Sequence, residues 1–186
     1  MPPTRPRVSF FFDLASPWTY LAAERVDQRF ANVRWQPAIG EALPGGRDTA
    51  AQRGAAEERA DQLQMPLVWP EVQPVVGRSA MRVAALATEH GRAAEFVLAA
   101  SRLAFCGGFD IDDPEILAEA AAAAGIALDD ALHAAGDVVR DGPIEAAAGM
   151  LLTAGAQRLP LLQVGRTLFC GEDRLTEAAA AARAVG

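Results

Sequence analysis

The chain has 186 residues, 51% of them hydrophobic, and a formal net charge of −7 at pH 7. This length allows one compact domain with a proper core, and the acidic charge argues against nucleic acid or an anionic membrane as the main partner. All 17 basic residues are arginine, so a catalytic lysine or a Schiff-base mechanism is excluded.

The first predicted elements are a strand over the apolar run Val8–Phe12 and, after Asp13, a helix that begins at Ser16-Pro17. Serine is a favoured N-cap, and proline is tolerated at the first helical position. The Ser16 hydroxyl is therefore expected at the positive end of the helix, beside unpaired N–H groups, where an anion such as a thiolate is favoured. Thioredoxin-like redox proteins carry Cys-x-x-Cys at this corner, whereas here Ser16 and Thr19 hold those positions. A thiol that reacts here must come from a ligand.

The middle of the chain is predicted to be mainly helical. Residues 33–39 alternate apolar and polar side chains, which indicates a second strand, parallel to the first because a helix separates them. A polar helix is predicted over residues 48–64, and residues 65–77 hold three prolines and should be extended or turning. Further helices are expected over 79–90 with Ser79 as its cap, over 93–105, from Asp113 onward, over 129–140 and over 143–154.

The end of the chain returns to strands. Residues 159–164 and 167–170 are predicted to form a hairpin about a tight turn, and residues 171–174 open a last, Ala-rich helix. The order βαβ, helical block, ββα predicts an α/β, thioredoxin-like fold with an inserted all-helical subdomain. The predicted division is a thioredoxin-like domain of residues 1–40 and 157–186 and an inserted subdomain of residues 41–156.

Three segments are expected to converge at one end of the sheet: the Ser16 corner, Leu159-Pro160, and residues 171–174. A proline that begins a strand cannot donate an N–H, so Pro160 is either an edge-strand start or part of a cis turn that leaves the preceding backbone free to pair with an extended ligand. Asp173 at a helix start either caps that helix or binds a ligand ammonium group. Ser16 alone would be an ordinary N-cap, and its combination with Pro160 and Asp173 favours a ligand site.

Four segments resemble those of one protein family. Residues 12–22, FDLASPWTYLA, are similar to its FDFxSPxSYLA corner, and residues 65–70, MPLVWP, to its GxPLxxP segment. Residues 107–114, GGFDIDDP, resemble its GxDIxDP helix break, and residues 158–160 with 168–175 resemble GVP and FWGxDRL. The family is that of the 2-hydroxychromene-2-carboxylate isomerases and kappa-class glutathione transferases, in the DsbA-like thioredoxin superfamily.

This resemblance implies glutathione as a bound co-substrate. The Ser16 hydroxyl would then hydrogen-bond the glutathione sulfur and favour its thiolate, the backbone of Leu159 would pair with the cysteinyl part beside a cis Pro160, and Asp173 would hold the γ-glutamyl end. In the isomerases of the family, the thiolate adds to a conjugated double bond, rotation follows, and elimination releases the isomer. The alternatives are a kappa-like transferase and, in another class, a non-catalytic binder of thiol peptides.

Several residues depart from the family pattern. Members usually carry a longer loop after the second strand with a lysine, so Arg59, or else Arg53, is expected to supply the cation. Glu172 is expected to place a second negative charge near a carboxylate of the ligand. The substrate pocket is expected to be lined by Trp18 and Trp69, although either tryptophan would serve equally as core, and by Cys170, which stands where the family has an aromatic residue.

Both cysteines, Cys106 and Cys170, are expected to be buried small apolar residues, with a disulfide between them as the less favoured alternative. His90 and His133 lack partners at metal-ligand spacing, so they are expected at the surface and no metal is predicted. We read no signal peptide, because Asp13 interrupts the first apolar run, and no membrane span. A cytoplasmic protein that acts on a small molecule, with a homodimer as an option, is the resulting expectation.

Overall fold

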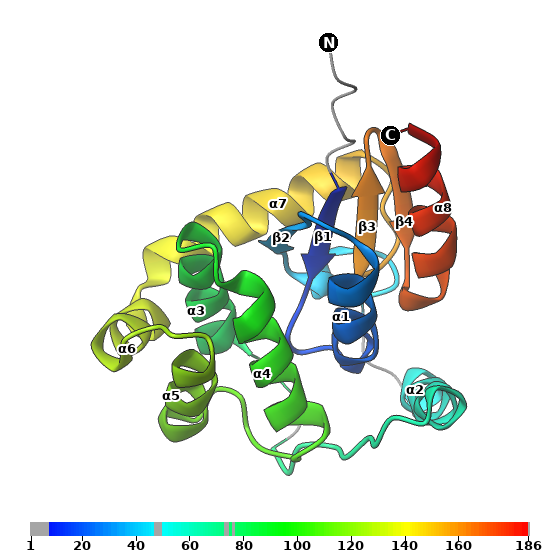
Figure 1. Cartoon of the computed structure of the whole chain (residues 1–186). Coiled ribbons are helices and arrows are strands. Elements are labelled where there is room, and N and C mark those ends of the chain that lie inside the picture. The colour runs from blue at the N-terminus through cyan, green and yellow to red at the C-terminus, as the bar shows by residue number, and fades with distance from the viewer. Residues whose placement is uncertain (1–7, 47–49, 73–74, 76, 186) are drawn as a thin grey trace.

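The computed structural model describes residues 8–46, 50–72, 75 and 77–185. Its strands form a mixed sheet in the order β2-β1-β3-β4 (Figure 1). β1 (Val8–Phe12) runs parallel to β2 (Arg34–Pro37) and antiparallel to β3 (Leu161–Val164), which pairs in a hairpin with β4 (Thr167–Cys170). The predicted α/β thioredoxin-like order is confirmed. The strands predicted over 33–39 and 159–164 are shorter than expected, because each is bounded by a proline, which lacks an N–H for the ladder.

Side chains that alternate along β1 separate the core into two parts. Phe10 and Phe12 belong to a large apolar cluster that includes residues of α1 (Pro17–Arg29) and α8 (Leu175–Val185). Phe11 points to the opposite face of the sheet and packs in a second cluster with residues of α7 (Asp141–Thr153). This is the period of two expected for a strand that is buried on both faces.

The remaining helices lie between β2 and β3 in the chain. They are α2 (Ala50–Leu63), α3 (Arg78–Glu89), α4 (Ala93–Phe105), α5 (Pro114–Ala123) and α6 (Leu128–Gly136), with short 3₁₀ turns η1 (Gly40–Ala42) and η2 (Val138–Arg140). A third 3₁₀ turn, η3 (Glu172–Arg174), lies between β4 and α8. α3 to α6 pack together on one side of the sheet, and α2 lies apart from them on the other side of α1 (Figure 1). The sequence assigned residues 41–156 to the inserted subdomain, but α7 within that range covers the sheet.

Of two helix N-caps predicted from local sequence, one is confirmed and one is wrong. Asp113 caps α5 as predicted, because its carboxylate accepts a hydrogen bond from the N–H of Glu115 at 2.8 Å. Ser79 does not cap α3, and this prediction was wrong. The N-cap is Gly77, whose φ of +63° is the left-handed conformation that favours glycine. The N–H of Ala80 bonds instead to the carboxylate of Asp112, 32 residues away, so a distant side chain completes this helix start.

Two other predictions were wrong. The helix expected over 129–140 ends at Gly136, and η2 follows because the carboxylate of Asp137 accepts from the N–H of Val139. Cys106 is exposed rather than buried, because it follows the buried Phe105 at the end of α4 and so points outward. Both cysteines are free thiols, and Cys170 is only partly buried.

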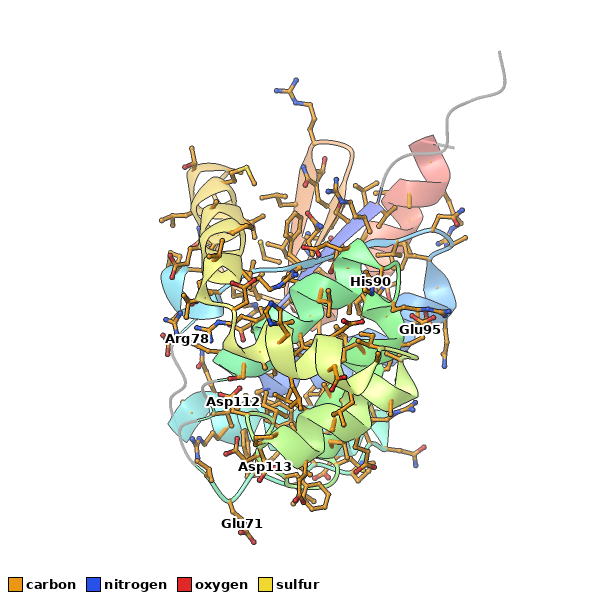
Figure 2. All side chains as sticks on the ribbon, turned by 90° about the vertical axis from the view of Figure 1, so that its left-hand side faces the viewer. Glu71, Arg78, His90, Glu95, Asp112 and Asp113 are labelled. Atoms are coloured by element: carbon orange, nitrogen blue, oxygen red, sulfur yellow. The ribbon has the colours of Figure 1, made fainter. Side chains whose placement is uncertain are left out.

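The surface predictions for the histidines are confirmed. His90 lies at the surface after α3 (Figure 2), and His133 is also exposed. Within the described ranges there is no cluster of histidine, cysteine and carboxylate side chains able to hold a metal ion. In the same part of the chain, no helix combines the length and apolar character that a membrane crossing needs.

Candidate functional site

The corner between β1 and α1 presents the Ser16 side chain as the sequence predicts. Ser16 is the N-cap of α1, with Pro17 at the first helical position, and its Oγ accepts a hydrogen bond from the N–H of Trp18 at 3.3 Å. That bond uses a lone pair of the hydroxyl and leaves its hydrogen free to be donated. Ser16 is partly buried and lines a cavity. The corner can therefore offer a hydroxyl donor to an acceptor placed in that cavity.

The buried carboxylate of Asp13 holds this corner in place. Its Oδ1 accepts from the N–H of Ala15 at 2.9 Å and its Oδ2 accepts from the N–H of Gly40 at 2.6 Å. The N–H of Asp13 donates to the Thr19 hydroxyl at 3.3 Å. Burial raises the pKa of the Asp13 carboxyl, and the two backbone hydrogen bonds partly offset this effect. Asp13 therefore ties the first turn of the corner to the segment that follows β2.

Residues 40–46, here called the 40–46 loop, carry this connection further. The N–H of Leu43 donates to the Gly40 carbonyl at 2.9 Å, and the N–H of Gly46 donates to the Leu43 carbonyl at 3.0 Å. The N–H of Gly45 donates to the carbonyl of Gln157 at 2.8 Å. A Cβ atom on Gly46 would overlap the Gly40 carbonyl. The short loop thus connects Asp13 with the segment that leads into Leu159.

Leu159-Pro160 is a cis peptide bond, as expected. The Pro160 carbonyl accepts from the N–H of Gly171 at 2.8 Å, which places the start of η3 beside this segment. No hydrogen bond from another described residue reaches the backbone N–H or carbonyl of Leu159. These two backbone groups are therefore available to an extended ligand.

Two adjoining cavities bring the predicted site residues together. The first has a volume of about 380 Å³ and is lined by Trp18, Arg59, Leu159, Glu172 and Asp173 among others. The second, of about 350 Å³, is lined by Ser16, Trp18, Trp69 and Leu159 among others. Both volumes lie within the usual range of roughly 300–1,000 Å³ for small-ligand sites. Trp18, Ala55, Arg158 and Leu159 line both cavities, so the two form one elongated site.

Two predicted residues stand outside these walls. Pro160 lies directly behind Leu159 and lines neither cavity. Cys170 is opposite Leu161 in the hairpin and packs against the apolar cluster under α7. The structure therefore does not place Cys170 with the rest of the predicted pocket, because the β4 side chain at this register points to the α7 face of the sheet.

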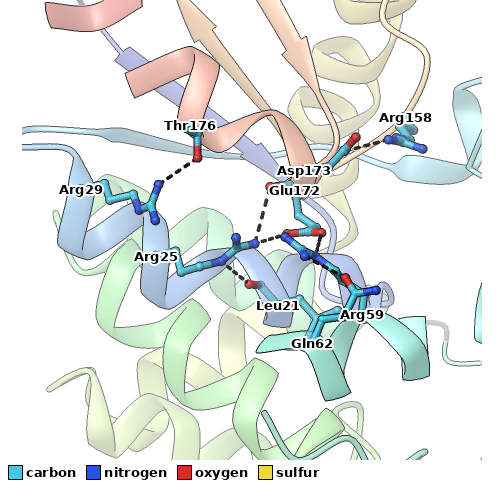
Figure 3. A network of polar contacts seen from close by, with 9 residues as sticks. All are labelled: Leu21, Arg25, Arg29, Arg59, Gln62, Arg158, Glu172, Asp173 and Thr176. Carbon is cyan, nitrogen blue, oxygen red and sulfur yellow. Dashed lines mark hydrogen bonds and ion pairs between the residues drawn. The ribbon is translucent and has the colours of Figure 1, made fainter. Parts of the chain in front are cut away.

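Glu172 lines the first cavity, but its negative charge is paired within the protein. Its side chain is 2% exposed and forms ion pairs with Arg25 of α1 and with Arg59 of α2, the latter at 2.6 Å (Figure 3). One carboxylate between two guanidinium groups leaves this cluster, Arg25–Glu172–Arg59, with a net charge of +1. Arg59 reaches the first cavity as expected, but its charge is shared with Glu172. The charge of Glu172 is therefore neutralised within the protein, although Glu58 and Asp173 also line this cavity.

The Asp173 carboxylate points away from this cluster, toward Arg158 (Figure 3). Arg158 Nη2 donates to Asp173 Oδ1 at 2.8 Å, and both side chains are about half exposed. Asp173 therefore faces outward, as one of its two predicted roles requires. Sequence reasoning missed Arg158 as a site residue, and its only signal was a charged residue directly before Leu159-Pro160.

Trp69 is held by contacts that limit its use as a stacking surface. Its indole N–H donates to Glu57 Oε1 at 2.7 Å, and the Arg53 guanidinium lies 5.1 Å from the ring centroid. Phe105 meets the ring edge-on at 6.2 Å. Trp69 thus joins α2 to the helical part of the molecule and also lines the second cavity, which combines the two predicted alternatives.

Comparison with models of known protein families identifies the family of the chain. The model of the DsbA-like thioredoxin domain matches residues 7–182. The chain belongs to the DsbA-like thioredoxin family. A search of curated proteins gives no significant match. This DsbA-like chain nevertheless lacks cysteine at positions 16 to 19, so its corner cannot form the disulfide that a Cys-x-x-Cys pair would make.

Three solved structures illustrate how closely the DsbA-like fold is shared. A 2-hydroxychromene-2-carboxylate isomerase has a TM-score of 0.79 at 18% identity, over 96% of this chain and 95% of that chain. A probable DsbA oxidoreductase from Streptomyces coelicolor has a TM-score of 0.73 at 17% identity, over 97% of this chain and 89% of that chain. A protein disulfide isomerase candidate from Nitrosomonas europaea has a TM-score of 0.69 at 16% identity, over 95% of this chain and 97% of that chain. At these identities the likeness establishes the fold alone.

Proposed function

We propose that this protein is a glutathione-dependent isomerase of the 2-hydroxychromene-2-carboxylate type. The observation that carries the proposal is the Ser16 hydroxyl, which stands at the N-terminus of α1 and lines a cavity continuous with Leu159 and Asp173. A hydroxyl cannot undergo disulfide exchange, but it can donate a hydrogen bond to a thiolate. The nucleophile is then the sulfur of a bound thiol peptide.

The positions of the other groups suit an extended thiol peptide. Its cysteinyl backbone would pair with the unpaired N–H and carbonyl of Leu159, and its sulfur would lie toward Ser16. The ammonium group at its γ-glutamyl end would bind Asp173 in the first cavity. The net positive Arg25–Glu172–Arg59 cluster favours a peptide carboxylate along the wall between them.

Ser16 has a defined task in this scheme. A free thiol has a pKa near 8.5, so little thiolate is present at neutral pH. A hydroxyl donor and the N-terminal end of a 13-residue helix both favour the charged form of the sulfur and lower that pKa. The thiolate adds to the electrophilic carbon of a conjugated double bond, and the electron pair moves to the conjugated oxygen. After rotation about the resulting single bond, the pair returns, the C–S bond breaks, and the thiolate is recovered.

The test begins with calorimetry of glutathione binding and a rate assay on a hydroxychromene carboxylate. Ser16→Ala should retain peptide binding but reduce the isomerisation rate by about tenfold or more at pH 7, and the rate should recover toward pH 9 as the thiol ionises without help. Ser79→Ala, a serine in the first turn of α3 that lines neither cavity, is the matched control and should leave the rate unchanged.

The outcomes separate the alternatives. Absence of binding at millimolar glutathione would contradict both the isomerase and a kappa-like transferase. Binding with conjugation to a generic electrophile, but without isomerisation, would favour the transferase, whose chemistry stops after addition. Binding without either reaction would identify a non-catalytic binder of thiol peptides.

A further inference from the structure

The ion pair of Arg158 and Asp173 lies in the wall of the first cavity and has unused hydrogen-bonding groups. Both residues line that cavity, and their contact is one bond, from Arg158 Nη2 to Asp173 Oδ1 at 2.8 Å. A guanidinium has five N–H donors, and a carboxylate accepts on both oxygens. Within the described part of the chain, Arg158 Nε and Nη1 and Asp173 Oδ2 have no partner. The pair therefore offers donors and an acceptor side by side.

We propose that Arg158 selects for the α-carboxylate at the γ-glutamyl end of the thiol peptide and so completes, beside Asp173, a receptor for the zwitterionic head of an α-amino acid. This inference rests on the proposed function and adds to it a residue that determines specificity. A simple anion would be repelled by Asp173, and a simple cation by Arg158. A ligand that carries an ammonium and a carboxylate on one carbon satisfies both.

Gly171 explains why the pair can lie so close to the backbone. Its φ of +103° is a conformation that favours glycine, and a Cβ atom at this position would overlap Asp173 Oδ1 as well as Nη2 and Nε of Arg158. The bonded ends of the two charged side chains thus lie directly against the α-carbon of Gly171. Any larger residue would push them apart.

The neighbouring Arg25–Glu172–Arg59 cluster is less suited to bind the zwitterionic head. Glu172 is buried and bonded to both Arg25 and Arg59, so its charge is already balanced within the protein. Arg158 and Asp173 are about half exposed, and an exposed ion pair contributes little to stability. Stability therefore does not account for this pair.

The experiment compares three peptides by calorimetry. They are glutathione, glutaryl-Cys-Gly, which lacks the α-ammonium, and 4-aminobutanoyl-Cys-Gly, which lacks the α-carboxylate. Arg158→Gln should weaken glutathione binding about tenfold and leave the 4-aminobutanoyl peptide unaffected. Asp173→Asn should weaken glutathione similarly and leave the glutaryl peptide unaffected. Arg174→Gln is the matched control, since Arg174 is adjacent, partly exposed and bonded to Glu177 outside both cavities, and it should change nothing.

Two results would overturn the receptor. One is that Arg158→Gln binds glutathione as tightly as the wild type or more tightly, which would mean that Arg158 only occludes Asp173. The other is an equal loss for all three peptides, which would mean that Arg158 acts without regard to the carboxylate. If the wild type binds none of the three peptides, the proposed function itself fails, and this result is distinct from the first two.

Discussion

The two sides of the candidate site are held by different forces. On the corner side, Asp13 is buried and binds the backbone N–H groups of Ala15 and Gly40. On the opposite side, Arg59, Arg158 and the two acids of η3 meet through ion pairs that are buried only at Glu172. Backbone hydrogen bonds in a buried site fix a geometry, whereas partly exposed ion pairs respond to salt and to charged ligands. The corner side is thus suited to position the reacting sulfur. The opposite side, formed by Arg59, Arg158, Glu172 and Asp173 and here called the ionic side, is suited to recognise the rest of the ligand.

The packing of α2 supports this contrast. Among its described side chains only Ala56 and Ala60 are buried, so α2 has little apolar surface in the core. Its polar contacts include the Arg59–Glu172 pair, the contacts of Glu57 and Arg53 with Trp69, and a bond from Gln52 to the Gly45 carbonyl. The ionic side therefore depends on polar contacts for its position.

The largest effect is expected when the 40–46 loop is disturbed. In Gly46→Ala, the new methyl group would overlap the Gly40 carbonyl, so the loop must shift and the free energy of unfolding should fall by about 3 kcal/mol. Gly54→Ala is the control, because a Cβ atom there meets nothing within 4 Å, and in α2 it should add about 0.5–1 kcal/mol. Urea unfolding measures both. Equal stability of Gly46→Ala and wild type would show that the corner side is not rigid.

On the ionic side, Glu172→Gln should lower the free energy of unfolding by about 2 kcal/mol, because two arginines lose their shared carboxylate. This is less than the roughly 3–5 kcal/mol expected for breaking a fully buried pair, since both arginines are partly exposed. Glu177→Gln removes an exposed partner of Arg174 and should leave the free energy of unfolding nearly unchanged. Similar losses in the two variants would contradict the central role of Glu172.

A smaller effect is expected in the contribution of Asp13 to the pH dependence of the free energy of unfolding. Because burial raises the pKa of this carboxyl in the folded state, the folded chain keeps a proton that the unfolded chain has lost. Stability contributed by Asp13 is therefore greatest at or below about pH 4, near the pKa of a free aspartate, and falls as the pH rises through the folded-state pKa.

The measurement compares wild type with Asp13→Asn in urea unfolding from pH 4 to pH 8. The difference in unfolding free energy should move in favour of Asp13→Asn as the pH rises, because the amide cannot ionise. A difference that moves the other way would show that the bonds from Ala15 and Gly40 outweigh burial.

The last prediction concerns Tyr20 and involves no substitution. Its hydroxyl donates to the Pro66 carbonyl at 2.8 Å, and burial raises the pKa of Tyr20 to about 12. It is the only tyrosine of the chain, so the absorbance of tyrosinate reports it directly. The folded protein should titrate near 12 and the urea-unfolded chain near 10, and stability should fall from about pH 10 upward. A folded-state midpoint near 10 would mean that α1 is not fixed to the segment that carries Trp69.

Local patterns of the sequence determined much of the architecture. The alternation along residues 8–12 and 161–164, the Ser16 and Asp113 caps and the hairpin after Pro160 depend on neighbours a few residues apart, so their residues alone predict them. Resemblance to known motifs then brought the corner, Leu159 and Asp173 into one site, and the cavities place them along one elongated site.

Only the tertiary structure decided the charges of that site. Glu172 meets Arg25 and Arg59, which are 147 and 113 residues away in the chain, and Asp13 meets Gly40 27 residues on. With 17 arginines and 24 acidic residues in the chain, sequence spacing cannot say which charges pair across loops and layers. Burial determines which charges pair, because a carboxylate that is removed from water must be hydrogen-bonded or ion-paired by groups of the folded protein.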